Sequence, residues 1–365
     1  MVTSPPAARR AASPEPLLAV APNLKRRLSG VTATIARLVP LQAQKEPVAA
    51  YGTGLPHDVP TIGTLRLLRE GYRRRSGQPV FHARRNTEML LGLVLRDLLF
   101  GRWKLLFTSA SQRHHTAWSR FLISRMDHVI ATSAAGQAYL AVPSDVVHHG
   151  IDIDSFSPPS DRAASRKSLG LPERPTIGCF GRIRRQKGTD VFVEAMIALL
   201  AERPAWQGVV LGRATEGHQA FLGELQSKAE AAGLADRILY PPEVPVDEVP
   251  QWYKALDIFV APQRWEGFGL TVLEALSTGV PTVATRVGAF PELIVDGETG
   301  FLIEPGNENA MIGPLAGLMD NEAERKAMAV AARRYAEQHF SIETEVETLL
   351  AIYRRLANES WDSAR

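Results

Sequence analysis

Short apolar runs alternate along the second half of the chain with stretches in which apolar residues recur every three or four positions. The first pattern is typical of buried strands and the second of amphipathic helices. Their alternation predicts a parallel sheet with helices on both faces. The strands predicted here are Thr176–Phe180, Gly208–Leu211, Arg237–Tyr240, Ile258–Ala261, Thr282–Ala284 and Phe301–Ile303.

The first half repeats this scheme less regularly. Its predicted strands are Pro16–Pro22, Val48–Tyr51, Val80–His82, Leu105–Thr108, Val129–Thr132 and Val146–His148, with helices at Val31–Val39, Thr64–Arg74, Thr87–Phe100, Thr116–Arg125 and Ala134–Leu140. A chain of 365 residues is too long for one ordinary core, so we predict two doubly wound domains facing a cleft. Ligands of such sheets bind at the carboxyl ends of the strands.

Composition narrows the class of protein. The chain is 45% hydrophobic and 22% charged, as in a soluble globular protein, and no apolar stretch approaches the roughly 18 to 20 residues of a membrane-spanning helix. The single cysteine, Cys179, lies in an apolar run and is expected to be buried and inert. No disulfide can form within the chain, which fits a reducing compartment, so we expect a cytoplasmic location.

Two acids, Glu266 and Glu274, bracket the most informative segment of the chain. Gly267 and Gly269 remove side chains where the backbone has to approach a ligand, and the helix that follows presents free amides to an anion. Carboxylates on either side of such a loop can bind hydroxyl groups flanking a bound phosphate, which is what a sugar nucleotide requires. The structural alternative is that Glu274 only caps or pairs within its helix.

This segment resembles the retaining glycosyltransferases of family four, which have the GT-B fold. The motifs that carry the resemblance are Arg264–Leu270, Glu274-Ala275, Gly279–Ala284, Pro291–Ile294 and Gly297–Leu302. Three stretches of the first half, Leu28–Ile35, Phe81–Met89 and Leu106–Arg113, are similar to the lipopolysaccharide core mannosyltransferases of that family.

Composition and the resemblance together give a domain plan. Residues 1–14, rich in Ala, Pro and Ser, would be a disordered tail. The resemblance implies an acceptor-binding Rossmann-like domain at 15–155 and a nucleotide-sugar-binding Rossmann-like domain at 156–340. Residues 341–365 would form a helix that crosses back to the first domain, with Trp361 as a possible anchor.

The resemblance also implies roles for individual residues. Arg182 and Lys187 would neutralise the departing diphosphate, as cations in a strand–loop–helix junction are suited to do. Glu266 would hold hydroxyls of the donor sugar and Glu274 the ribose. The backbone amides expected to bind the donor are those of Gly267, Phe268 and Gly269 at the sugar and of Leu270 and Thr271 at the distal phosphate.

The first domain offers further candidates. Gly30 opens a predicted helix and could face the diphosphate, although a plain turn explains it equally well. Thr108 or Ser109 stands where relatives often carry a histidine, so His82 and His114 are the local alternatives, and a structural role is open for each. We expect no metal site and no cofactor. Asp152-Ile153-Asp154 spells a metal-binding motif of another glycosyltransferase fold, but it lies in Gly150–Pro159, which we predict to link the two domains.

Charge is distributed unevenly. Residues 1–160 hold 20 Lys and Arg against 10 Asp and Glu, a net +10, whereas residues 161–365 hold 22 against 29, a net −7. The basic half, with clusters at Lys25–Arg27 and Arg73–Arg75, fits peripheral contact with anionic lipid at the inner face of the plasma membrane. It has no interleaved aromatics or nucleic-acid motif, so we expect no nucleic-acid partner.

These observations lead to one main expectation and one alternative. The main expectation is a retaining enzyme that moves mannose from GDP-mannose onto an anionic glycolipid, the inner core of lipopolysaccharide. The alternative is a soluble glucosyltransferase that uses UDP- or ADP-glucose on a small sugar or a glucan.

Overall fold

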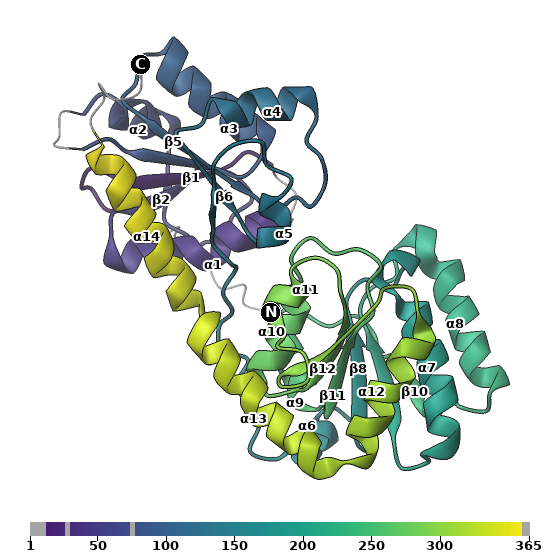
Figure 1. Ribbon diagram of the computed structural model, residues 1–365. Helices are drawn as coiled ribbons and strands as arrows, with labels where there is room; N and C mark the ends of the chain where they lie inside the picture. The colour runs from purple at the N-terminus through teal and green to yellow at the C-terminus, as the bar shows by residue number, and fades with distance from the viewer. Residues whose placement is uncertain (1–11, 26–29, 74–76, 360–365) are drawn as a thin grey trace, which may run out of the picture. The chain divides into compact units, whose positions relative to one another are not determined.

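The computed structural model describes residues 12–25, 30–73 and 77–359. They form two compact units (Figure 1). The first comprises the described residues up to His148 together with those from Ile342 onward, and the second is His149–Ser341.

The sheet of the first unit is entirely parallel. Its strand order is β3-β2-β1-β4-β5-β6-β7, so the chain starts near the middle, moves to one edge and returns to build the other. Val20 of β1 pairs with Ala49 on one side and with Phe81 on the other. The strands are β1 Ala19–Asn23, β2 Val48–Gly52, β3 Thr61–Ile62, β4 Val80–Ala83, β5 Lys104–Ser109, β6 His128–Ala131 and β7 Asp145–Val146.

Helices cover both faces of this sheet because each has one apolar stripe. The helices are α1 Gly30–Lys45, α2 Thr64–Glu70, α3 Asn86–Leu93, the π-helix η1 Val94–Leu98, α4 Ala117–Ser124, α5 Ala134–Gln137 and α14 Ile342–Asn358. One core lies under α1 and α14, which pack against each other (Figure 1). Residues of α2, α3, η1 and α4 line two further clusters of the unit. The last helix therefore belongs to the first unit, although it is the end of the chain.

The second unit has the same plan with six parallel strands in the order β10-β9-β8-β11-β12-β13. They are β8 Thr176–Phe180, β9 Gln207–Leu211, β10 Ile238–Leu239, β11 Ile258–Ala261, β12 Thr282–Thr285 and β13 Gly300–Ile303. The order reverses between β8 and β11, so the loops that follow these two strands lie at the switch point where doubly wound sheets bind ligands.

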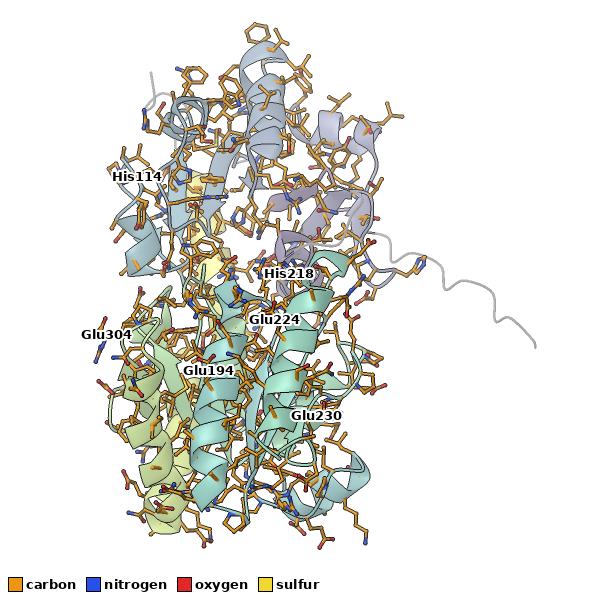
Figure 2. All side chains as sticks on the ribbon, turned by 90° about the vertical axis from the view of Figure 1, so that its right-hand side faces the viewer. His114, Glu194, His218, Glu224, Glu230 and Glu304 are labelled. Carbon is orange, nitrogen blue, oxygen red and sulfur yellow. The ribbon has the colours of Figure 1, made fainter. Side chains whose placement is uncertain are left out.

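Two layers of helices enclose this second sheet. The helices are α6 Arg162–Ser168, η2 Arg185–Lys187, α7 Thr189–Glu202, η3 Glu216–His218, α8 Gln219–Ala231, α9 Val249–Lys254, α10 Leu270–Ser277, α11 Phe290–Leu293, α12 Glu308–Asp320 and α13 Glu322–His339. One core cluster contains residues of α7, α8 and α12, and the other contains residues of α9, α10, α11 and α13. Figure 2 shows α7 and α8 side by side, with Glu194 on α7 and Glu224 and Glu230 on α8.

The structure corrects several predicted elements. The first helix does not stop at Val39 but runs through Pro40 to Lys45, because Gln42 is buried as well and the helix keeps packing beyond the proline. The predicted helix Thr87–Phe100 divides into α3 and the π-helix η1. The sequence also missed the short strand β3 and the helix α12, which contains Pro314.

The domain boundaries also differ in detail. Residues 149–155 were assigned to the first domain, but they lie in the second unit, where Ile151 N donates to the carbonyl of Phe340 (2.8 Å). Ser341 belongs to the second unit too. Of the tail predicted at 1–14, residues 1–11 lie outside the described part, whereas Arg66 donates to the carbonyls of Ala12 and Ser13. Trp361 also lies outside the described residues. Among the described helices, none is long and apolar enough to cross a membrane.

Candidate active site

Two glycines bring the loops after β8 and β9 into direct backbone contact. Gly181 and Gly212 both have positive φ, 132° and 150°. A Cβ on Gly212 would lie 1.9 Å from the carbonyl oxygen of Gly181, so no larger residue fits there without a shift of backbone. This contact fixes the loop Arg182–Lys187 at the carboxyl edge of the sheet.

Charged side chains join the same loop to the segment that follows β11. Arg264 makes two bonds to Asp190, Nη1 to Oδ1 at 2.8 Å and Nη2 to Oδ2 at 3.1 Å, and its amide donates to the carbonyl of Gln186 (3.0 Å). Arg185 donates to Glu224 of α8 (2.8 Å), a residue labelled in Figure 2. The Arg185 side chain nevertheless remains 66% exposed, so it is Arg264 that holds the two segments together. Such bidentate pairs are geometrically specific, so the two loops are held in one arrangement.

Lys187 and Glu266 meet in this arrangement. The Lys187 ammonium forms an ion pair with Glu266 Oε2, and Glu266 Oε1 accepts a hydrogen bond from the amide of Gly267 (2.9 Å). Both side chains are largely buried, with 20% and 16% of their surfaces exposed. Arg182 is exposed and makes no hydrogen bond or ion pair with a described residue. The site therefore contains one cation held by a carboxylate and one whose donors remain available for a ligand.

The N-terminus of α10 completes the site on the side of Glu266. Gly269 has φ 109°, and a Cβ there would lie 2.0 Å from Cε1 of Phe290, so only glycine can make this turn. The first amides of a helix have no partner within it, so those of Leu270 and Thr271 carry partial positive charge. Thr271 Oγ1 is buried and has no hydrogen-bond partner among the described residues. An anion at this end of α10 would satisfy these donors.

Glu274 lies one turn into α10 beside a tyrosine that the sequence did not single out. Tyr253 of α9 is fully buried, and its hydroxyl donates to the carbonyl of Thr271 (3.2 Å). Burial, and then the neighbouring Glu274 carboxylate, raise the pKa of Tyr253 well above its ordinary value. The hydroxyl thus stays protonated beside the carboxylate. Tyr253 had no signal of its own, because an aromatic residue in an amphipathic helix looks like ordinary core.

Phe268 differs from its neighbours in the loop. The sequence named only its amide, but its side chain is buried and packs edge-on against His149 with ring centroids 5.0 Å apart. This burial anchors the loop between the two flexible glycines. The amides of Gly267 and Gly269 are therefore presented from a loop that is fastened at its middle.

In the first unit the structure gives His82 the environment of a core residue. It is fully buried, with Nδ1 2.6 Å from the hydroxyl of Tyr353 and Nε2 2.6 Å from Thr108 Oγ1. Burial, and then the charges of Arg84 and His128, hold its pKa well below the usual value. This neutral, fully bonded ring favours the structural alternative, and Thr108 is engaged with it.

Three other first-unit candidates are dispersed. Ser109 Oγ lies 3.5 Å from Nε2 of His115, a histidine that the sequence passed over in favour of His114. His114 packs on Tyr139 instead, with centroids 5.2 Å apart. Gly30 starts α1, but nothing lies within 4 Å of the position its Cβ would occupy, so no close approach demands a glycine.

A buried polar cluster at the carboxyl end of β1 also escaped the sequence analysis. Asn23 Oδ1 accepts hydrogen bonds from Thr32 (3.1 Å) and from Arg85 (3.0 Å), and Arg85 also pairs with the buried Glu88 (2.7 Å). The side-chain nitrogen Nδ2 of Asn23 donates to the backbone carbonyl of Thr53 (2.6 Å). These bonds join the end of β1, the first turns of α1, the segment after β2 and the start of α3. Arg85 and Glu88 belong to the Phe81–Met89 stretch noted in the sequence.

Asp152, in the Asp-Ile-Asp stretch, serves a turn. Its Oδ1 accepts from the amides of Asp154 (3.1 Å) and Ser155 (3.0 Å). Among the described residues, no group of three or more His, Cys, Asp or Glu side chains is arranged to hold a metal ion.

The sequence of this chain is similar to those of known glycosyltransferases. Residues 161–335 match the model of the glycosyl transferases group 1. The lipopolysaccharide core biosynthesis mannosyltransferase LpsB of Rhizobium meliloti (strain 1021) is 51% identical over 92% of this chain and 97% of its own length. The corresponding LpcC of Rhizobium leguminosarum bv. viciae is 45% identical over 93% and 97%.

The fold is shared more widely than the sequence. The crystal structure of HepE from Anabaena in complex with UDP superposes with a TM-score of 0.80 at 20% identity, covering 93% of this chain and all of that one. The α/β fold of two Rossmann-like sheets and the resemblance to core mannosyltransferases, both expected from the sequence, are confirmed.

Proposed function

The chain belongs to the group 1 glycosyl transferases, and on that premise we propose that it transfers mannose from GDP-mannose, with retention, to an anionic glycolipid of the lipopolysaccharide inner core. It is a glycosyltransferase. The choice of mannose and of lipopolysaccharide follows the names of the relatives LpsB and LpcC. The observation that carries the role of the site is the convergence of Lys187, Glu266 and the start of α10 at the switch point of the second sheet.

The donor is proposed to bind with its diphosphate between these groups. Lys187 and the exposed Arg182 neutralise the phosphates, and the amides of Leu270 and Thr271 bind the distal one at the positive end of α10. Glu266, with the amides of Gly267 to Gly269, receives hydroxyls of the sugar. Glu274, whose neighbour Tyr253 stays protonated, receives the ribose.

In the proposed reaction, the bond between the anomeric carbon and the phosphate oxygen breaks. The acceptor hydroxyl forms its new bond on the same face of the sugar, and its proton passes to the departing phosphate oxygen. Preorganised positive groups stabilise the negative charge that develops on the diphosphate. No side-chain nucleophile and no metal ion are required, so Glu266 binds the donor and does not attack it, unlike the nucleophile of a retaining glycosidase.

The acceptor is proposed to reach the enzyme from an anionic membrane surface on the cytoplasmic side. The excess of basic residues in the first 160 positions supports this, since each Lys or Arg near such a surface contributes about 1 kcal/mol. Of the two basic clusters, Arg26, Arg27, Arg74 and Arg75 lie outside the described residues.

A thermal-shift titration tests the donor. The full-length protein is heated with GDP, UDP or ADP and with their mannose and glucose conjugates, each with and without a chelator. A ligand present at a hundredfold excess over its Kd adds about 2.7 kcal/mol to the free energy of unfolding. We expect GDP and GDP-mannose to raise Tm, unchanged by the chelator. A response to UDP or ADP compounds alone would instead identify the glucosyltransferase alternative.

Site variants test the assignment of residues. Lys187→Met and Glu274→Gln should each abolish the shift caused by the nucleotide and most of the turnover. Lys326→Met is the matched control, because Lys326 forms an exposed ion pair with Glu322 on α13. Normal turnover in Lys187→Met or Glu274→Gln would refute the proposed site.

A further inference from the structure

The first unit carries a group of large apolar side chains that its own fold leaves in solvent. At the end of η1, Leu98 is 67% exposed and Phe100 77% exposed, with Leu99 and Tyr72 beside them. We call Tyr72, Leu98, Leu99 and Phe100 the apolar tip. On α4, Trp118 and Phe121 are 51% and 54% exposed and stack on one another with centroids 5.7 Å apart. We call this pair the aromatic ridge.

The apolar tip is held in place by backbone and side-chain bonds. The Tyr72 hydroxyl donates to the carbonyl of Leu99, the amide of Leu99 to Val94 (2.9 Å) and the amide of Arg102 to Gly71 (2.8 Å). Phe100 has φ 53°, the single positive value for a residue other than glycine among the described residues. A bulky residue in this region is strained and persists only where its surroundings impose it. The surrounding fold therefore holds Phe100 in a strained backbone conformation in which its side chain is exposed to solvent.

The tip and the ridge are neighbours. α3, which leads into η1, packs against α4 (Figure 1), and Asn86 donates to Ser119 (2.8 Å). At the other end, Arg125, which follows α4, lies 3.6 Å from Asp97 of η1, the residue before Leu98. Phe121 is about one helical turn from Arg125. The two groups thus form one surface of the first unit.

Positive charge surrounds this surface. Arg69 on α2, Arg102 after the tip, and Arg113, Arg120 and Arg125 around α4 are all exposed. Asp97, the acid at the tip, is paired with Arg96 (2.7 Å) and Arg125. A two-fold dimer formed through this face would bring like charges together, so charge complementarity favours an anionic partner over such a dimer. Aromatic residues next to arginines are characteristic of segments that lie in the headgroup region of a bilayer.

We propose that the apolar tip and the aromatic ridge insert into the headgroup region of an anionic membrane, with the surrounding arginines binding lipid phosphates. The proposal rests on the proposed function only in that a lipid-borne acceptor gives the enzyme a reason to dock. It differs from the contact expected through the sequence clusters Lys25–Arg27 and Arg73–Arg75, because it assigns the insertion to named apolar side chains and requires no participation of those clusters.

Vesicle binding by the full-length protein tests this surface. The probes are vesicles of phosphatidylcholine with and without phosphatidylglycerol, and binding is followed by flotation and by the blue shift of tryptophan fluorescence. We expect binding to the anionic vesicles only. Phe100→Ser and the pair Trp118→Ser/Phe121→Ser should each weaken vesicle binding by about tenfold or more, because each removes apolar area that the membrane would bury. The matched control is Val246→Ser/Val330→Ser, which changes exposed apolar residues of the second unit and should bind as the wild type does.

Three results would overturn the proposal. Phe100→Ser and Trp118→Ser/Phe121→Ser could bind as tightly as the wild type, vesicle binding could be independent of phosphatidylglycerol, or gel filtration could show a dimer that Phe100→Ser disrupts. The nucleotide titration is independent of these measurements. If GDP-mannose raises Tm but the protein does not float with vesicles, the proposed function stands and the membrane surface is refuted. If the protein floats with vesicles but no nucleotide raises Tm, the membrane surface stands and the proposed function is refuted.

Discussion

A Tyr353→Phe substitution, compared with His82→Gln, would decide whether His82 is structural or catalytic. The Tyr353 hydroxyl lies 2.6 Å from Nδ1 of His82, and both residues are fully buried. Phenylalanine keeps the edge-on ring packing, with centroids 5.6 Å apart, and removes only the hydroxyl. The ring nitrogen then loses this partner where water does not reach it, which costs about 1–3 kcal/mol. For a domain of about 150–250 residues, each kcal/mol lowers Tm by about 2–4 °C, so a fall of about 2–12 °C is expected.

A double-mutant cycle with His82→Gln isolates the bond itself. The two residues are in contact, so their effects should not add, and the coupling energy should reach about 0.5–3 kcal/mol. Tyr51→Phe is the control in the same unit, because its hydroxyl bond to Thr64 (3.2 Å) is exposed. We expect that control to change the free energy of unfolding by no more than about 0.5 kcal/mol.

The assay combines urea unfolding, followed by circular dichroism, with initial rates of sugar transfer at a temperature where every variant is folded. If His82 is structural, both variants lose stability and keep kcat within about twofold. A general acid or base contributes about 10²–10⁴-fold to the rate. The structural assignment would be refuted by His82→Gln with normal stability and a hundredfold loss of kcat.

Three further predictions concern other parts of the molecule. Gly269→Ala should abolish the nucleotide-induced thermal shift, because its Cβ would meet Phe290 at 2.0 Å, whereas Gly217→Ala, in open space, should respond normally. As pH is lowered below about 6.5, the free energy of unfolding should fall by up to about 1.4 kcal/mol per pH unit, because His82 takes up a proton in the unfolded chain but, with its depressed pKa, not in the folded one. If the urea midpoint of His82→Gln falls as steeply as that of the wild type when pH is lowered, this explanation is wrong. Burial raises the pKa of Cys179 to about 12, so mass spectrometry should find no alkylation of the native protein at neutral pH and full alkylation in urea.

Local patterns were enough to predict most of the second unit. Thr176–Phe180 and Ile258–Ala261 were predicted with the bounds that the structure has, because a strand covered on both faces is an uninterrupted apolar run. The first helix was predicted to end before Pro40, and α12 was missed, because each contains a proline whose local cost is offset by burial of the helix. Tertiary packing overrides local propensity in such cases.

The candidate site was also predicted only in part from the sequence. Glu266 and Glu274 stood out because they bracket a loop with two glycines after an apolar run, and Lys187 because the family resemblance implies a cation at its position. Their joint arrangement could not be predicted from spacing, since Lys187 and Glu266 are 79 positions apart and meet only because β8 and β11 are neighbours in the sheet. Tyr253 was not identifiable for a related reason, because the Thr271 carbonyl and the Glu274 carboxylate beside its hydroxyl come from another helix.

By itself the sequence determined the fold class, the family and the segment that holds the donor-binding candidates, because periodicity, glycines and charged residues are local properties of the chain. Tertiary structure alone decided that His82 is buried between Tyr353 and Thr108, that Arg264 pairs with Asp190, and that the Phe100 side chain is exposed to solvent. Burial, pKa and exposure depend on neighbours that the fold brings from distant positions, and no stretch of sequence carries that information.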